Sequence, residues 1–187
     1  MFNIINMTLG LFIGRLNPPH LGHLSIIDKA LVENDRVIVL IGSKNLIDEQ
    51  NPLSYEEIKE LLLEKYSDNL KLQIIELRDD RSDLVWIYSI YRIIFENGNK
   101  IKDINLYGGD FKNDSAYNTI KKYENHFNNF KFNYIENSRS NSFINYNGKE
   151  YPISSTNLRK ALNDWDIKLA SKFCEQKMFE KIKTLKF

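Results

Sequence analysis

The chain has 187 residues, of which 42% are hydrophobic, and it carries 26 lysines and arginines against 25 aspartates and glutamates, a formal net charge of +1. This hydrophobic content is enough for the core of one domain, and the near-neutral charge gives no field that would favour DNA, RNA or an acidic membrane. The single cysteine, Cys174, excludes an internal disulfide and a thiolate zinc cage, and no stretch is apolar enough for a membrane span or a signal peptide, so we expect a cytoplasmic protein that binds neither nucleic acid nor membrane.

Short apolar runs alternate with segments of helical periodicity, a pattern typical of a parallel α/β sheet. The runs that we predict to be strands cover residues 9–13, 37–41, 72–77, 104–107 and 130–135. Four helices are predicted between them. The first begins near Gly22, and the second begins at Ser54, which forms a capping box with Glu57. The third runs from about 84 to 95 and the fourth covers about 115–123. We therefore expect five parallel strands flanked by helices.

The composition changes after the fifth predicted strand. Asn147-Gly148 lies between two strand-like runs and predicts a β-hairpin at 143–151. A helix that ends near Asn163 follows, and a last helix over about 166–182, with Cys174 inside it, is predicted to form a small C-terminal extension. We expect one domain, residues 1–187, with its catalytic core at about 9–163.

The most informative segment is the turn between the first predicted strand and helix. Residues 14–23 read Gly-Arg-Leu-Asn-Pro-Pro-His-Leu-Gly-His, which places His20 and His23 beside the unpaired amides of a helix N-terminus, an arrangement that suits phosphate. Gly14 directly after the strand and Gly22 beside the histidines favour close approach of a ligand to the backbone. A two-histidine metal site and a pair of surface histidines are the alternatives.

A second candidate is the hydroxyl-rich start of a later helix. Its Ser154, Ser155 and Thr156 precede Arg159 by one helical turn, and hydroxyls with a guanidinium fork can grip phosphate oxygens, although the same residues can be an ordinary cap and a solvated arginine. In this fold class ligands bind outside the carboxyl ends of the strands. Three further candidates lie at such ends, and each could also be an ordinary loop: residues 42–45, which include Ser43, the pair Asp79-Asp80, and residues 108–110, which include Gly109.

Two of these segments resemble motifs of the nucleotidyltransferase superfamily. Residues 14–23 resemble its Gly-x-Phe-x-Pro-x-His-x-Gly-His motif, and residues 153–159 its Ile-Ser-x-Thr-x-x-Arg motif. The Gly14-Arg15 start, the segment 51–54 and Asp79 with Trp86 seven residues later are similar to the archaeal-type nicotinamide mononucleotide adenylyltransferases. The resemblance spans about residues 9–163.

The chain departs from the family pattern at three positions and in one segment. Leu16 replaces the usual Phe, and Ile58 stands where many members have an Arg. Residues Gly109 to Lys112 are similar to a segment of the bacterial members, except that Asp110 stands where those members have a His. The predicted hairpin looks like extra sequence. These departures concern substrate detail more than the type of reaction.

The resemblance implies a Rossmann-like adenylyltransferase that condenses ATP with nicotinamide mononucleotide to give NAD and pyrophosphate, with Mg²⁺ as the cofactor that accompanies ATP. The catalytic residues would be His20, His23 and Arg159. The ATP-binding residues would be Gly14, Arg15, Gly22, Gly109, Lys112, Ser154, Ser155 and Thr156. The mononucleotide would contact Ser43, Asp79, Asp83 and Trp86, and no residue is expected to ligate a metal.

Several alternatives stay open at this point. The acceptor could be nicotinate mononucleotide or phosphopantetheine, and a non-catalytic module that senses adenine nucleotides or NAD is a different class of function. Trp86 also fits an ordinary core position on its helix. The sequence leaves the oligomeric state open, a homo-oligomer included.

Overall fold

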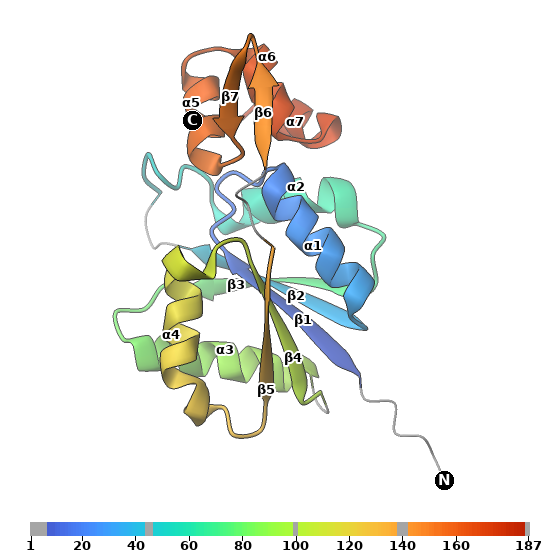
Figure 1. Cartoon of the computed structure of the whole chain (residues 1–187), viewed down its shortest axis with the longest axis vertical. Coiled ribbons are helices and arrows are strands. Elements are labelled where there is room, and N and C mark those ends of the chain that lie inside the picture. The colour runs from blue at the N-terminus through green and yellow to red at the C-terminus, as the bar shows by residue number, and fades with distance from the viewer. Residues whose placement is uncertain (1–6, 44–46, 99–100, 138–141, 186–187) are drawn as a thin grey trace.

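The computed structural model describes residues 7–43, 47–98, 101–137 and 142–185 (Figure 1). A five-stranded parallel sheet has the order β3-β2-β1-β4-β5. Its strands are β1 (Thr8–Gly14), β2 (Arg36–Ser43), β3 (Leu72–Arg78), β4 (Asp103–Gly108) and β5 (Lys131–Glu136). All five predicted strands are confirmed. The strand order reverses direction between β1 and β4, which is where ligands bind in sheets of this kind.

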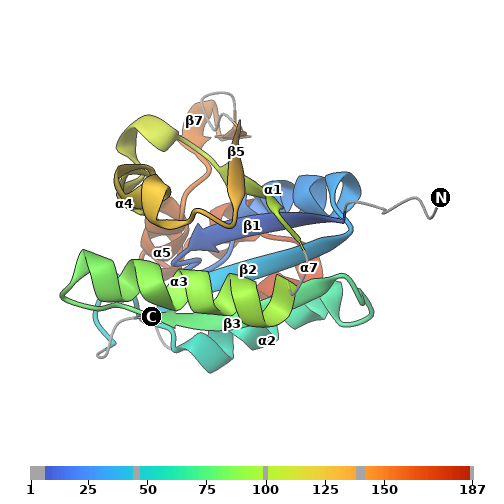
Figure 2. The same ribbon diagram turned by 90° about the horizontal axis from the view of Figure 1, so that it is seen from below.

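Helices cover both faces of the sheet. One face carries α1 (Leu21–Glu33) and α2 (Tyr55–Tyr66), and the other carries α3 (Asp83–Gly98) and α4 (Ser115–Tyr123), as Figures 1 and 2 show from two directions. Side chains alternate along each strand, so that Phe12 of β1 packs in the core under α1 and α2 while Leu11 packs in the core under α3 and α4. The flanking helices predicted from the sequence are confirmed.

The start of α2 has the predicted capping box. The Ser54 amide donates to Glu57 Oε2 at 2.8 Å, and the Glu57 amide donates to Ser54 Oγ at 3.3 Å. Leu53 and Ile58, on either side of this cap, are both buried in the same core. This cap fixes where the chain enters α2 and therefore where the preceding turn lies.

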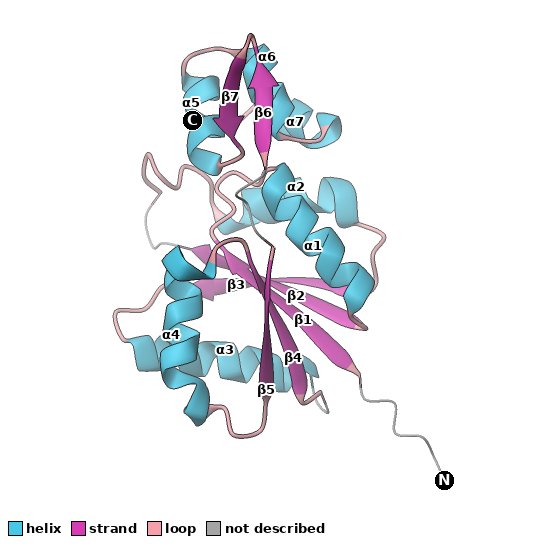
Figure 3. Ribbon diagram, in the orientation of Figure 1, coloured by secondary structure: helices cyan, strands magenta, loops and turns pink. Residues whose placement is uncertain are grey.

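A hairpin and three helices form a layer beyond α1 and α2 (Figure 3). The hairpin pairs β6 (Phe143–Tyr146) with antiparallel β7 (Lys149–Pro152), and Asn147 and Gly148 turn between them with φ of 50° and 74°. The hairpin prediction is confirmed because both turn residues adopt the left-handed conformation that Asn-Gly favours. The helix α5 (Ser155–Asn163) follows.

The prediction of one continuous last helix is wrong. The chain forms α6 (Ile167–Ala170), a short 3-10 turn η4 (Ser171–Phe173) and α7 (Gln176–Ile182), and Cys174 lies between them in extended conformation. In a single helix, with 100° per residue, Leu169 and Met178 would face opposite sides. The break turns both side chains into one core.

Two shorter 3-10 turns, η1 (Phe111–Asn113) and η2 (Glu124–His126), flank α4. His126, in η2, is exposed. Among the helices within the described ranges, none has the length and apolar character needed to cross a membrane.

The buried Cys174 gives a test of the C-terminal packing. Burial raises the pKa of its thiol to about 12, because the thiolate would lose its hydration. Near neutral pH the thiol stays protonated, and we expect the folded protein to react with Ellman's reagent on the order of 100-fold more slowly than the urea-unfolded protein.

The matched control is Gln176→Cys, which adds a thiol at an exposed position two residues away. Its new thiol should react rapidly in the folded protein while Cys174 does not. Equally fast reaction of Cys174 in the folded chain would contradict the packing described here.

Candidate functional site

The two histidines of the first turn stack on each other at the start of α1. Their ring centroids are 3.7 Å apart with an interplanar angle of 24°, and both side chains are buried. His20 caps the helix, because its Nδ1 accepts a hydrogen bond of 3.1 Å from the Gly22 amide. An accepting Nδ1 puts the proton of the neutral His20 ring on Nε2, which leaves that nitrogen as a donor.

The loop before these histidines is fastened by a buried amide. Asn17, only 5% exposed, donates from Nδ2 to the Leu53 carbonyl at 2.8 Å and accepts at Oδ1 from the Leu53 amide at 3.0 Å. One side chain thus satisfies both backbone groups of a residue at the start of α2. Asn17 was not among the residues singled out from the sequence, since asparagine in a turn next to proline is common for local reasons.

The helix α5 is tied to the same loop from the other side. Arg159 donates from Nη1 to the Asn17 carbonyl, and Ser155 donates from Oγ to the Pro18 carbonyl at 2.9 Å. The structure therefore brings the two sequence motifs together, although they lie far apart in the chain. The start of α5 is therefore held against the loop that leads into α1.

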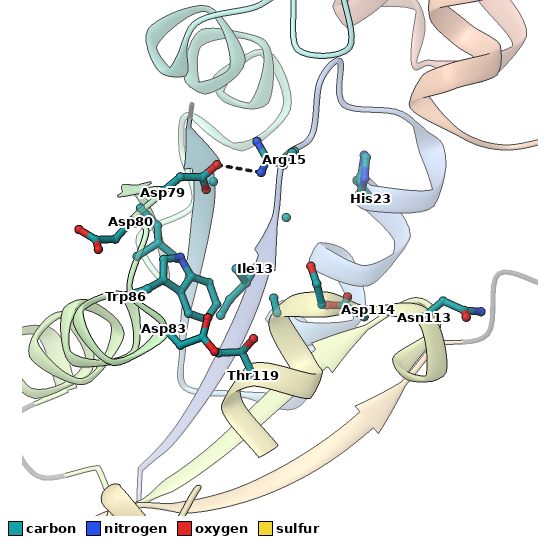
Figure 4. A pocket seen from close by; sticks show the side chains of 15 residues that line it. Ile13, Arg15, His23, Asp79, Asp80, Asp83, Trp86, Asn113, Asp114 and Thr119 are labelled. Atoms are coloured by element: carbon teal, nitrogen blue, oxygen red, sulfur yellow. Dashed lines mark hydrogen bonds and ion pairs between the residues drawn. The ribbon is translucent and has the colours of Figure 1, made fainter. Parts of the chain in front are cut away.

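A cavity of about 560 Å³ opens at the carboxyl ends of the strands beside α3 and α4; we call it the carboxylate-lined cavity (Figure 4). Its walls include Trp86 of α3, and Figure 4 shows His23 and Asp114 across from the tryptophan. The carboxylates along it are those of Asp79, Asp80, Asp83 and Asp114. Arg15 enters from the end of β1, and its Nη2 lies 2.8 Å from Asp79 Oδ2.

Five of the residues expected to bind the mononucleotide or ATP therefore meet here: Gly14, Arg15, Asp79, Asp83 and Trp86. Asp80, a candidate because it follows the third strand, lines the same cavity, whereas Asp114 was missed. Asp114 caps α4 by accepting from the Tyr117 amide at 3.0 Å, and an aspartate at a helix start has no sequence signal beyond that of a cap. Its position opposite Trp86 depends on the packing of α4 against α3.

A second cavity, of about 570 Å³, lies between the first turn and α5; we call it the arginine-lined cavity. Its described lining is free of carboxylate side chains and consists of Arg15, Asn17, Gln50, Asn51, Ser155, Thr156 and Arg159. Burial lowers the pKa of the Arg159 guanidinium from its usual value, and the nearby charge of Asp48 opposes that shift. Two guanidinium groups with amide and hydroxyl groups between them are suited to a polyanion.

Other sequence-predicted residues line neither cavity. Lys112 is exposed on η1, and Gly109 is buried at the end of β4. Ser154 caps α5 by accepting from the Asn157 amide at 3.1 Å, which is the ordinary role that the sequence also allowed. The side chain of Ser43 lies outside the described part of the chain.

The three departures from the family pattern have structural roles. Leu16 and Ile58 are buried in the core under α1 and α2. Asp110 begins η1 by accepting from the Lys112 amide at 3.2 Å, and a hydrogen bond from Asn113 lowers the pKa of its carboxyl group. The departures at these three positions therefore change the packing and local turns around the cavities rather than the cavity linings.

No group of three or more histidine, cysteine, aspartate and glutamate side chains within the described residues could hold a metal ion. A metal site built on His20 and His23 thus finds no third ligand of these types in the described part of the chain.

A family model described as cytidylyltransferase-like matches residues 11–161. The nicotinamide/nicotinic acid mononucleotide adenylyltransferase of Acinetobacter baylyi is 29% identical over 112 residues, 57% of this chain and 57% of that protein. The nicotinamide-nucleotide adenylyltransferase of Caldivirga maquilingensis is 36% identical over 90 residues, 45% of this chain and 50% of that protein. The chain thus spans about half the length of the curated relatives it matches.

The fold is also similar to a solved structure, that of a bifunctional NMN adenylyltransferase/ADP ribose pyrophosphatase from Francisella tularensis. The TM-score is 0.64 at 21% sequence identity, and the match covers 85% of this chain and 43% of that one. At this identity the likeness is one of fold, and it confirms the Rossmann-like α/β architecture.

The Asn17 side chain gives a test of the site's framework. In Asn17→Ala the buried amide and carbonyl of Leu53 lose their partners, and we expect the free energy of unfolding, measured by urea denaturation, to fall by about 2 kcal/mol. Asn118→Ala removes the same group from an exposed position on α4 and should leave stability nearly unchanged. Equal stability of the two variants would show that the Asn17 contacts are not made.

Proposed function

The chain belongs to the cytidylyltransferase-like family, and on that premise we propose that it is a nicotinamide-nucleotide adenylyltransferase, which joins ATP and nicotinamide mononucleotide to give NAD and pyrophosphate. The observation that carries this proposal is the pair of adjoining cavities. One is lined by arginines and hydroxyls, the other by a tryptophan and carboxylates, and Arg15 lines both. The names of the curated relatives support the same reaction.

The arginine-lined cavity is assigned to the triphosphate of ATP. Arg159, the hydroxyls of Ser155 and Thr156, and the amides at the start of α5 would hold the β- and γ-phosphates and the departing pyrophosphate. Mg²⁺ would enter with ATP as part of the substrate, bound to phosphate oxygens and water, because the described lining of this cavity offers no carboxylate. Lys112 and Gly109 are not needed in this assignment.

The reaction is an in-line displacement at the α-phosphorus. A phosphate oxygen of the mononucleotide forms the new bond to the α-phosphorus, and the bond from that phosphorus to the bridging oxygen breaks, so that the electron pair leaves with pyrophosphate. A phosphate dianion is already nucleophilic, so positioning and charge stabilisation carry the reaction without a strong base. His20 and His23 would donate hydrogen bonds whose strength grows as charge develops in the transition state.

The carboxylate-lined cavity is assigned to the nicotinamide ring. The ring is a flat cation, which an indole face attracts by stacking and by cation–π interaction. Trp86 is half-buried on the cavity wall, with Asp79 and Asp83 close enough to the same space to offset the ring charge or accept from the carboxamide. A contact from Ser43 stays a prediction from the sequence.

The direct test is a pyrophosphate-release assay with ATP, Mg²⁺ and a panel of acceptors, with NAD identified by chromatography. We expect the highest kcat/KM with nicotinamide mononucleotide. Turnover confined to nicotinate mononucleotide or phosphopantetheine would show that this compound, and not nicotinamide mononucleotide, is the acceptor. Binding of NAD without turnover of any acceptor would favour the sensing module instead.

His23 has a specific expected effect on turnover. His23→Ala should lower kcat by roughly 10²-fold or more, because one donor to the developing charge is lost. His126→Ala is the matched control, since His126 is exposed on η2 and lines neither cavity. Unchanged kcat in a folded His23→Ala protein would contradict the proposed role of His23 as a hydrogen-bond donor in the transition state.

Trp86 should act on one substrate only. Trp86→Ala is expected to raise KM for the mononucleotide roughly 10-fold, the cost of one lost stacking contact, with little change in KM for ATP. Tyr88→Ala removes an exposed aromatic side chain from the same helix and should change neither constant. Because Trp86 also packs against the core, Trp86→Phe should recover both folding and most of the affinity. A rise in KM for ATP, with no rise in KM for the mononucleotide, would indicate that Trp86 is a core residue and does not contact the nicotinamide ring.

A further inference from the structure

Of the described residues, Arg15 alone lines both cavities. It leaves the end of β1, and its guanidinium is turned toward the carboxylate-lined cavity, where Nη2 contacts Asp79 Oδ2 at 2.8 Å (Figure 4). The two side chains are 45% and 37% exposed, so water screens their attraction and the pair can be exchanged at low cost. A more highly charged anion in the neighbouring cavity would compete for the same guanidinium.

The charges around Asp79 make this exchange consequential. Arg15 is the only arginine or lysine in the described lining of the carboxylate-lined cavity, whereas four aspartates line it. Asp83 is paired outside the cavity, 3.4 Å from Lys122 Nζ. Withdrawal of Arg15 therefore leaves Asp79 without its cation in a space that already carries a negative potential.

We propose that the Arg15–Asp79 ion pair couples the two cavities, so that ATP and the mononucleotide each strengthen the binding of the other. This inference rests on the proposed function. When ATP fills the arginine-lined cavity, its phosphates take the guanidinium, and the released carboxylate of Asp79 attracts the pyridinium ring. When the mononucleotide binds first and takes Asp79, Arg15 is released toward the triphosphate, and the two effects are equal by linkage.

The coupling also selects the ring. Nicotinamide mononucleotide presents a cationic ring with a neutral carboxamide, which gains from a free Asp79. Nicotinate mononucleotide carries an additional carboxylate, which gains from Arg15 staying beside Asp79 and is repelled once Arg15 has left. ATP is therefore expected to favour nicotinamide and to give no advantage to nicotinate.

The test is a set of calorimetric titrations. The Kd of nicotinamide mononucleotide is measured alone and with a saturating amount of the α,β-methylene analogue of ATP, in which the bond to the leaving group cannot break. We expect the analogue to lower this Kd about 10-fold in the unaltered protein, within the usual range of coupling between sites. The Kd of nicotinate mononucleotide should stay unchanged or rise.

Three variants isolate the ion pair. In Arg15→Gln and in Asp79→Asn, the Kd of nicotinamide mononucleotide should be the same with and without the ATP analogue. The concentration of analogue that saturates each variant is set from the Kd of the analogue measured for that variant. Arg78→Gln is the matched control, because Arg78 directly precedes Asp79 but pairs with Glu76 at 3.1 Å and lines neither cavity. It should retain the full coupling. Circular dichroism and thermal unfolding establish that each variant is folded.

Independent binding of the two ligands in the unaltered protein would overturn the coupling and leave the proposed function standing. Persistence of the coupling in folded Arg15→Gln would overturn the role of the ion pair. Failure of either ligand to bind the unaltered protein would overturn the proposed function, and the coupling with it.

Discussion

The site depends on the hydrogen bonds that fix the loop between β1 and α1. The Asn17 amide holds both backbone groups of Leu53, while Arg159 and Ser155 donate to the carbonyls of Asn17 and Pro18. Three parts of the chain are thus joined at one loop. The positions of the histidines that follow it and of Arg15 that precedes it result from this fastening rather than from the sheet alone.

The sequence predicted the elements whose signals are local. Strands follow from apolar runs, the start of α2 from its capping box, and the hairpin from Asn147-Gly148. The break at Cys174 escaped prediction because neither glycine nor proline marks it and only the direction of the core requires it. The motif residues and the aspartates after β3 were found, but the cavity position of Asp114 was not, since it arises from how α4 packs against α3.

Net charge concealed the most useful electrostatic feature of the molecule. A formal charge of +1 describes a chain without a dominant field, yet the structure separates its charges into one cavity lined by arginines and another lined by aspartates. Such a separation suits a reaction between a polyanion and a molecule that carries a cationic ring. A near-neutral net charge is thus compatible with a local site for a small polyanionic ligand.

The joining of α5 to the first turn has a consequence for biosynthesis. Ser155 and Arg159 bond to carbonyls 137 and 142 residues earlier in the chain. During translation the five strands of the parallel sheet leave the ribosome before α5 does, so a nascent chain can form the sheet while the arginine-lined cavity still lacks one wall. A ligand of the arginine-lined cavity would therefore stabilise only chains in which α5 has already docked.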